Sequence, residues 1–133
     1  MNKMYLKPTI SIAELQAELG TRTHAAGNVV DHANAIASGN TVVYQGQAGG
    51  MAFVSPEKTS VGKGLVINNM TDPSLMNHHN MRVLRGHAKA LKLTKIIAYS
   101  TTPGYVDAAT KHYGFKIAGH HPTLGTTLVH GVL

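Results

Sequence analysis

Residues 63–115 constrain the fold of this chain more than any other stretch. The apolar run at 64–67 predicts a strand, and a turn is expected at 68–73. Residues 73–92 predict a long helix, because the stretch opens with Pro directly after an Asp that is a good N-cap. The apolar run at 95–99 predicts a second strand. A strand, a crossover helix and a second strand form a βαβ-like unit, which often binds a ligand where its strands end.

Two further helices are predicted before this stretch. Ser11 and Glu14 have the spacing of a capping box, in which each side chain bonds the amide of the other residue. Apolar residues then recur at helical spacing up to Gly20, which is a natural C-terminal stop. A second helix is expected within residues 21–39, with a cap at Thr23 or Asn28 and an end at Gly39-Asn40; it would contain Val29, Val30, Ala33, Ile36 and Ala37.

The rest of the chain is predicted to form short strands, one short helix and turns. Runs of β-branched and aromatic residues alternate with clusters rich in Gly and Pro, as in hairpins and strand ends. The strands are expected at 4–10, 41–44, 51–54, 61–67, 115–119 and 126–132, the short helix at 105–113, and turns at 45–50, 55–60 and 120–125.

The long helix has two stripes of side chains at helical spacing. The apolar stripe, expected to face a sheet, consists of Met81, Leu84, Ala88 and Leu91. The basic stripe consists of Arg82, Arg85, Lys89 and Lys92. A basic stripe is either a solvated helix face or an interaction surface for nucleic acid or for an acidic protein, including a homo- or hetero-oligomeric partner.

Composition limits the classes of function. A chain of 133 residues is expected to form one domain, and the formal net charge of +6 favours polyanionic partners. The chain has no cysteine, which excludes disulfides, thiolate zinc sites and a cysteine nucleophile and fits a cytoplasmic protein. The sequence has no apolar run long enough to span a membrane.

The expected order of elements, together with residues 108–117, resembles the GCN5-related N-acetyltransferase (GNAT) family. Residues 108–117 are Ala-Ala-Thr-Lys-His-Tyr-Gly-Phe-Lys-Ile, and many members have a short helix that ends in Gly-Phe before an apolar strand. The resemblance implies a single α+β domain over residues 1–133. Its central sheet is mixed but mostly antiparallel, with helices on both faces, and its cofactor is acetyl-CoA.

The cofactor loop of the family does not match. Members place a glycine-rich loop before the long helix, where free amides bind the pyrophosphate. The corresponding residues 72–78 contain no glycine, Pro73 removes one amide, and Asp72 adds a negative charge. If acetyl-CoA binds here, the resemblance implies contacts from Ser74, Asn77 and His78.

The catalytic positions do not match either. The tyrosine that acts as general acid in many members corresponds to Thr110, which leaves Tyr105 and Tyr113 as other candidates. The general base of the family is often a Glu on a central strand. The acidic candidates here are Glu57, in an expected turn, and Asp72. The histidine candidates are His78, His79 and His87.

These departures favour a GNAT-like domain that has lost acyl-CoA catalysis and acts as a structural or interaction protein, without a cofactor. Degenerate domains of this size resemble the small internal virion proteins of podoviruses, so a virion location is one expectation. The alternatives are an atypical N-acyltransferase that uses acetyl-CoA and a basic module that binds nucleic acid. No metal site is expected, because adjacent residues of the His78-His79 pair point about 100° apart on a helix.

Overall fold

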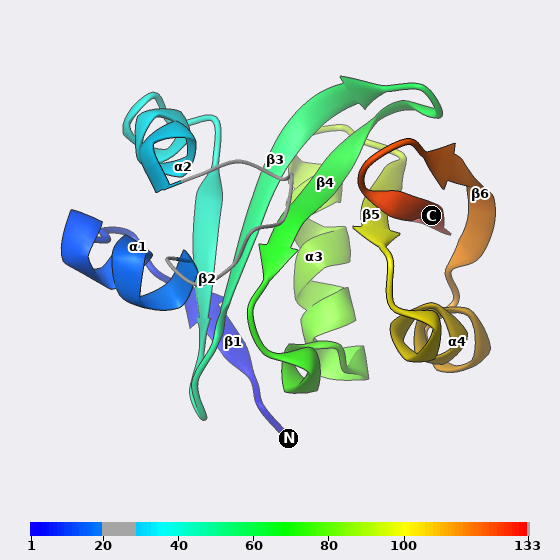
Figure 1. Cartoon of the computed structure of the whole chain (residues 1–133), viewed down its shortest axis with the longest axis horizontal. Helices are drawn as coiled ribbons and strands as arrows, with labels where there is room; N and C mark the ends of the chain where they lie inside the picture. The colour runs from blue at the N-terminus through cyan, green and yellow to red at the C-terminus, as the bar shows by residue number, and fades with distance from the viewer. Residues whose placement is uncertain (20–28, 133) are drawn as a thin grey trace.

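The protein contains one seven-stranded sheet with the strand order β1-β2-β3-β4-β5-β7-β6 (Figure 1). The computed structural model describes residues 1–19 and 29–132. Strands β4 and β5 are parallel and all other neighbours are antiparallel, so the predicted mixed, mostly antiparallel sheet is confirmed. The strands are β1 (Met4–Leu6), β2 (Val42–Gly46), β3 (Met51–Thr59), β4 (Gly62–Met70), β5 (Lys95–Ser100), β6 (Lys116–His121) and β7 (Gly125–Gly131).

Helices cover both faces of the sheet, as predicted (Figure 1). Helices α1 (Ile12–Leu19) and α2 (Val29–Ala37) pack on one face, where Phe53 and Val43 form a small core with Leu15. Helix α3 (His78–Ala90) and helix α4 (Pro103–His112) pack on the other face over a larger core that includes Leu65, Ile96 and Leu84. The fold class is therefore α+β.

The predicted capping box at the start of α1 is confirmed. The Ser11 amide donates to Glu14 Oε1 at 3.1 Å, and the Glu14 amide donates to Ser11 Oγ at 3.1 Å. Lys7 Nζ lies 2.8 Å from Glu14 Oε2, and the hydrogen bond with Lys7 is the main cause of the lowered pKa of Glu14. The predicted cap of α2 at Thr23 or Asn28 lies outside the described residues.

The strands around the β3–β4 hairpin are longer than predicted. The turn expected at 55–60 is wrong, because β3 continues through Pro56 to Thr59. Proline cannot donate to a ladder, but β2 pairs with β3 only as far as Val54, so among the described residues Pro56 has no paired strand on that side. The turn expected at 68–73 is also largely wrong, because β4 extends to Met70.

The long helix begins later and ends earlier than predicted. Asp72 caps a single 3₁₀ turn, η1 (Pro73–Leu75), and α3 starts only after a second cap at Asn77. Of the expected apolar stripe, Met81, Leu84 and Ala88 are buried, whereas Leu91 is 45% exposed because the helix has already ended at Ala90.

Strand β6 also differs from its prediction. Alternate apolar residues of the strand expected at 115–119 should be half-buried, but Ile117 is 62% exposed whereas Phe115 is buried. The strand lies at the edge of the sheet, where its one paired neighbour among the described strands is β7, and most of its residues are exposed. His120 and His121, expected in a turn, are the last residues of this strand.

Candidate functional site

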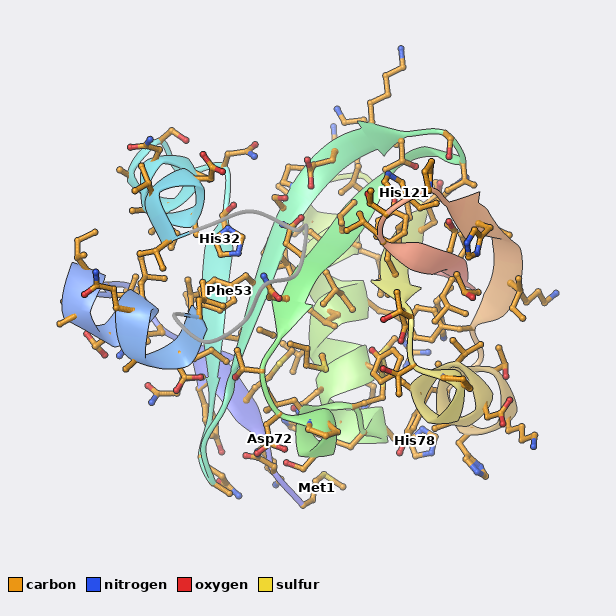
Figure 2. All side chains as sticks on the ribbon, viewed as in Figure 1. Met1, His32, Phe53, Asp72, His78 and His121 are labelled. Atoms are coloured by element: carbon orange, nitrogen blue, oxygen red, sulfur yellow. The ribbon has the colours of Figure 1, made fainter. Side chains whose placement is uncertain are left out.

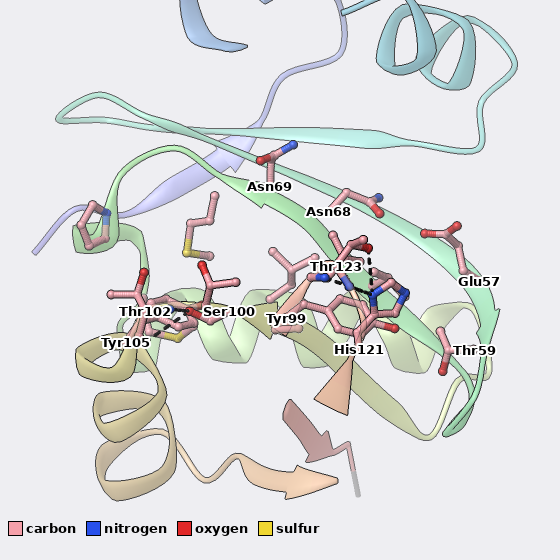
Figure 3. A pocket seen from close by; sticks show the side chains of 18 of the residues that line it. Glu57, Thr59, Asn68, Asn69, Tyr99, Ser100, Thr102, Tyr105, His121 and Thr123 are labelled. Carbon is pink, nitrogen blue, oxygen red and sulfur yellow. Dashed lines mark hydrogen bonds between the residues drawn. The ribbon is translucent and has the colours of Figure 1, made fainter. Parts of the chain in front are cut away.

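The main cavity opens where β4 and β5 separate. The two parallel strands pair at only two positions, Leu65 with Ile96 and Val66 with Ile97. Beyond these pairs the strands diverge, and a cleft of about 1100 Å³ extends between them (Figure 3). It is lined by residues of β3, β4, η1, β5, α4 and the β6–β7 turn. The predicted ligand position at the strand ends of the βαβ-like unit therefore coincides with a real cavity.

A β-bulge in β4 shapes one wall of the cleft. Phe53 of β3 pairs with Asn69 and Val54 pairs with Ile67, so Asn68 is the extra residue. A bulge interrupts the alternation of side chains. Both asparagines consequently point to the α1/α2 side of the sheet.

Hydrogen bonds fix these two asparagine side chains. Asn68 Nδ2 donates to Ser55 Oγ at 2.7 Å, and Ser55 Oγ donates to Glu57 Oε2 at 3.0 Å. Asn69 Nδ2 lies 2.9 Å from Nε2 of His32, a buried residue of α2. The Glu57 carboxylate is thus held at the end of a short polar chain on the α1/α2 side of the cleft.

Tyr99 and His121 lie at the same mouth as Glu57 (Figure 3). Their ring centroids are 5.5 Å apart, with the rings edge to face. Burial raises the pKa of the Tyr99 phenol, a hydrogen bond with Thr59 partly offsets this effect, and the charge of Glu57 adds to it. The mouth therefore combines a carboxylate, a protonated phenol and an imidazole.

The opposite mouth lies on the α3/α4 side and is more apolar. Met76, Tyr105 and Tyr113 pack against the large core and also line the cleft. Burial raises the pKa of Tyr105 to about 12, which keeps its phenol protonated at neutral pH. The ring centroids of Tyr113 and His78 are 5.0 Å apart, so the end of α4 contacts the start of α3.

The predicted cofactor residues Ser74, Asn77 and His78 lie at this junction, but two of them are engaged. The Ser74 amide donates to Asp72 Oδ1 at 2.9 Å, and its hydroxyl accepts from Asn2 Nδ2 at 2.9 Å. Asn77 Oδ1 accepts from the Asn80 amide, and its Nδ2 donates to the carbonyls of Asn2 and Ser74. Only His78 is exposed without a side-chain hydrogen bond to the described part of the chain.

The other predicted catalytic candidates are separated. The Thr110 hydroxyl donates to the Val106 carbonyl at 2.9 Å, so it is used within its own helix. His87 Nδ1 lies 2.7 Å from the Tyr44 hydroxyl, between α3 and β2. His79 does not line the cleft, and of the acidic candidates only Glu57 does.

The basic stripe lies away from the cleft. Arg82, Arg85 and Lys89 surround a shallow hollow of about 330 Å³ together with Gly86 and Val132. Lys92 is not part of it, because this residue follows the end of α3 and has a φ of 59°.

Within residues 1–19 and 29–132, no three His, Asp or Glu side chains gather as metal ligands. No helix in the same part of the chain has the length and apolar character needed to cross a membrane.

Sequence reasoning missed Tyr99, Asn68, Asn69 and His121 as residues of the site. The two asparagines were assigned to a turn, and only the register of β3 against β4 reveals the bulge. The Ile-Ile-Ala-Tyr run that forms β5 was the available signal for Tyr99, since polar residues at the end of a central strand often line ligand sites.

No protein-family model and no curated protein sequence matches the chain. Solved structures do match over nearly its full length. A protein from Klebsiella pneumoniae subsp. pneumoniae MGH 78578, assigned as an acyl-CoA N-acyltransferase, is 11% identical, with a TM-score of 0.59 over 100% of this chain and 99% of that one.

Two further structures have similar TM-scores. A mutant AtaT toxin bound to the C-terminus of the antitoxin AtaR and acetyl-CoA is 13% identical, with a TM-score of 0.56 over 99% of this chain and 94% of that one. A chain of the KacTA-DNA complex is 12% identical, with a TM-score of 0.53 over 99% of this chain and 94% of that one. At these identities the likeness concerns the fold: the chain has the GNAT-like fold of acyl-CoA N-acyltransferases.

Proposed function

We propose that this protein binds acyl-CoA in the cleft between β4 and β5 and transfers the acyl group to an amine. The observation that carries this proposal is the open cleft of about 1100 Å³ at the divergence of the two parallel strands. The acetyl-CoA bound to the similar AtaT toxin supports the choice of ligand. This proposal reverses the preference for a domain without a cofactor, because the cleft between the two strands is open and not closed by side chains.

The edge of β4 suits the extended arm of a CoA thioester. Beyond Val66 the side of β4 that faces β5 has no paired strand in the described part of the chain. An open strand edge carries backbone donors and acceptors that pair with amides of an extended ligand. The arm would then lead the thioester toward the middle of the cleft.

The residues of the two mouths fit acyl transfer. The amine nitrogen attacks the thioester carbonyl carbon, the new N–C bond forms, the C–S bond breaks, and the electron pair of that bond goes to sulfur. Glu57 can take a proton from the amine. Tyr113 or Tyr105 can stabilise the leaving thiolate, either by donating a proton to the sulfur or by donating a hydrogen bond to it. The pKa of about 12 makes Tyr105 better suited to donating a hydrogen bond than a proton.

Binding of the cofactor phosphates is expected to be weaker than at a glycine-rich loop. Asp72 occupies the Ser74 amide, and the Asn77 side chain caps α3, so fewer donors remain at the helix start. Among Ser74, Asn77 and His78, the exposed His78 has the greatest freedom to contact a phosphate.

The test is a thermal shift with acetyl-CoA. Binding should raise the melting temperature, and a ligand at 100 times its Kd stabilises a protein by about 2.7 kcal/mol. Ala108→Trp, which fills the cleft from α4, should abolish the shift. Ala37→Trp, at the exposed end of α2, is the matched control and should retain it. Absence of any shift at millimolar acetyl-CoA would refute the proposal.

A second candidate function is a non-catalytic interaction protein, in the cytoplasm or in a virion. It is favoured by the hollow lined by Arg82, Arg85 and Lys89, since no carboxylate of the described residues forms an ion pair with these side chains. The DNA in the similar KacTA complex is one model for a polyanionic partner.

This candidate predicts binding to duplex DNA that falls steeply with salt. The double variant Arg82→Gln and Lys89→Gln should weaken binding and reduce the salt dependence. A variant with Lys3→Gln and Lys63→Gln removes the same charge from other exposed positions and should bind nearly as the parent does. If both double variants lost DNA affinity equally, the binding would depend on the net charge of the protein and not on the basic residues of α3.

A further inference from the structure

His121 has an unusual set of hydrogen bonds at the α1/α2-side mouth of the cleft. It is the last residue of β6, and the chain turns back after it into β7. The backbone amides of Thr123 and Leu124 both donate to its Nδ1, at 3.1 and 3.0 Å. The Thr123 hydroxyl lies 3.2 Å from the same nitrogen (Figure 3).

These contacts determine which ring nitrogen carries the hydrogen. An amide N–H can donate only to an unprotonated nitrogen, and two amides share Nδ1 here. In the neutral ring the hydrogen is therefore on Nε2. His121 consequently offers the cleft a fixed hydrogen-bond donor, and it has no free lone pair with which to act as a base.

Glu57 supplies the complementary group at the same mouth. Its Oε2 accepts from Ser55, which in turn accepts from Asn68, so the carboxylate has a defined orientation. No described residue donates to Oε1 in the hydrogen bonds of this site. Tyr99 connects the two residues: its ring lies against His121, and its pKa is sensitive to the charge of Glu57.

We propose that the acceptor is an amine with a carbonyl or carboxylate oxygen next to the amino group, as in α-amino acids and their amides. The Glu57 carboxylate binds the amino group, and the Nε2–H of His121 donates to the neighbouring oxygen. Lys58 also lines the cleft and favours an oxygen with negative charge. The inference rests on the proposed N-acyltransferase function and goes beyond it by assigning the class of acceptor and the residue that selects it.

A simple alkylamine can form only one of these two contacts. It satisfies Glu57 but leaves the Nε2–H of His121 without its partner. A single hydrogen bond at a partly exposed site corresponds to about a tenfold preference. We therefore expect glycinamide to be acylated about tenfold more efficiently than ethylamine, in kcat/KM, under equal conditions.

The experiment compares glycinamide and ethylamine with acetyl-CoA as donor and CoA release as readout. His121→Asn retains an oxygen that accepts from the Thr123 and Leu124 amides but lacks the distal N–H, so the turn should stay intact. His120→Asn changes the exposed neighbour on the same strand and is the matched control. The preference should disappear in His121→Asn and persist in His120→Asn.

A second measurement is independent of turnover. The ¹⁵N spectrum of the histidine rings should show His121 with its hydrogen on Nε2, and glycinamide should shift the amide signals of Thr123 and Leu124 even without acetyl-CoA. Ethylamine should shift them less.

The outcomes separate the two proposals. Turnover with equal use of both amines would overturn the acceptor inference and leave the N-acyltransferase proposal in place. Absence of acetyl-CoA binding would overturn the N-acyltransferase proposal. In that case glycinamide shifts at Thr123 and Leu124 would still support the amine site, and their absence would overturn it as well.

Discussion

Asn80 is the polar side chain that connects the start of α3 to the N-terminal segment. It is 1% exposed, and both its Oδ1 and its Nδ2 form hydrogen bonds inside the fold. Its Oδ1 accepts from the Met4 amide at 2.9 Å, and its Nδ2 donates to the carbonyls of Asn2 and Leu75 at 2.9 and 2.8 Å. The side chain thus holds β1, η1 and α3 together behind the cleft.

Removal of this side chain should be costly. Asn80→Ala leaves the Met4 amide and the Leu75 carbonyl without this buried partner, whereas the Asn2 carbonyl still accepts from Asn77. Each group that loses its partner costs about 1–3 kcal/mol. We expect a loss of about 3 kcal/mol in the free energy of unfolding, measured by urea denaturation. Asn34→Ala, on the exposed face of α2, is the control and should change little. Equal stability of the two variants would show that Asn80 is not a structural anchor.

His32 is a buried polar residue that packs beside Phe53 and contacts Asn69, a residue of the cleft wall (Figure 2). It is 4% exposed, its ring stacks on Phe53 with centroids 5.2 Å apart, and its Nε2 contacts Asn69. Burial lowers the pKa of His32, and the charge of Asp31 offsets this only in part. The folded protein therefore resists protonation of this ring more than the unfolded chain does.

This residue should make stability depend on pH. As the pH falls below roughly 6.5, the unfolded chain binds a proton that the folded His32 does not, so the free energy of unfolding falls. His87 has a pKa lowered by burial and adds a contribution of the same sign. His32→Gln should lose less stability than the parent between neutral pH and about pH 5.5 in urea titrations. The exposed control His120→Gln should keep the parent slope, and a parent slope in His32→Gln would contradict this assignment.

At the scale of elements, the β2–β3 turn supports η1 and so the cleft wall. Gly49 and Gly50 both have positive φ, at 105° and 84°, and disfavour side chains to a similar degree. A Cβ on Gly50 would lie 2.5 Å from the Cβ of Asp72, whereas a Cβ on Gly49 meets nothing within 4 Å. An alanine at Gly49 therefore introduces backbone strain alone, whereas an alanine at Gly50 introduces the same strain and a steric clash with Asp72, the N-cap of η1.

The paired variants Gly49→Ala and Gly50→Ala test this contact. We expect about 1 kcal/mol of destabilisation for Gly49→Ala, from backbone strain alone. Gly50→Ala should lose clearly more stability and should also weaken acetyl-CoA binding, because η1 must shift and its residue Pro73 lines the cleft. Similar thermal shifts for both variants would indicate that the turn does not control the position of η1.

Several elements were predictable because their signals are local. The Ser11–Glu14 capping box and the apolar spacing of α2 depend on residues within a few positions of each other, and both helices occur where expected. The late start of α3 was not predictable in this way. Asp72-Pro73 is a valid helix start, but Asn2 and Asn80, distant in sequence, stabilise a second cap at Asn77.

The candidate site was less predictable than the fold for the same reason. Its position at the ends of β4 and β5 followed from the βαβ-like pattern. Its residues did not, because the bulge at Asn68 depends on register with β3, and His121 reaches the cleft only through the pairing of β6 with β7. Glu57 was weighed as a base but assigned to the turn expected at 55–60, whereas it lies in β3.

At the scale of the whole molecule, the sheet consists of two parts joined weakly. Strands β1–β4 form one part and β5–β7 the other, and in the described part of the chain their strand pairing consists of the two residue pairs between β4 and β5. Helix α3 crosses between the parts on one face (Figure 1). A ligand in the cleft would contact both parts and should suppress their relative opening.

This arrangement predicts the pattern of hydrogen exchange on ligand binding. Acetyl-CoA should slow amide exchange in residues 67–70 of β4 and 98–100 of β5, because these segments border the cleft and have few ladder bonds to each other. Exchange in α1, on the far side of the sheet, should change little and serves as the internal control. The measurement is exchange followed by mass spectrometry with and without acetyl-CoA, in the parent and in Ala108→Trp. Protection confined to α3 around Arg82 and Lys89 would instead place the ligand on the basic hollow and would contradict binding between the strands.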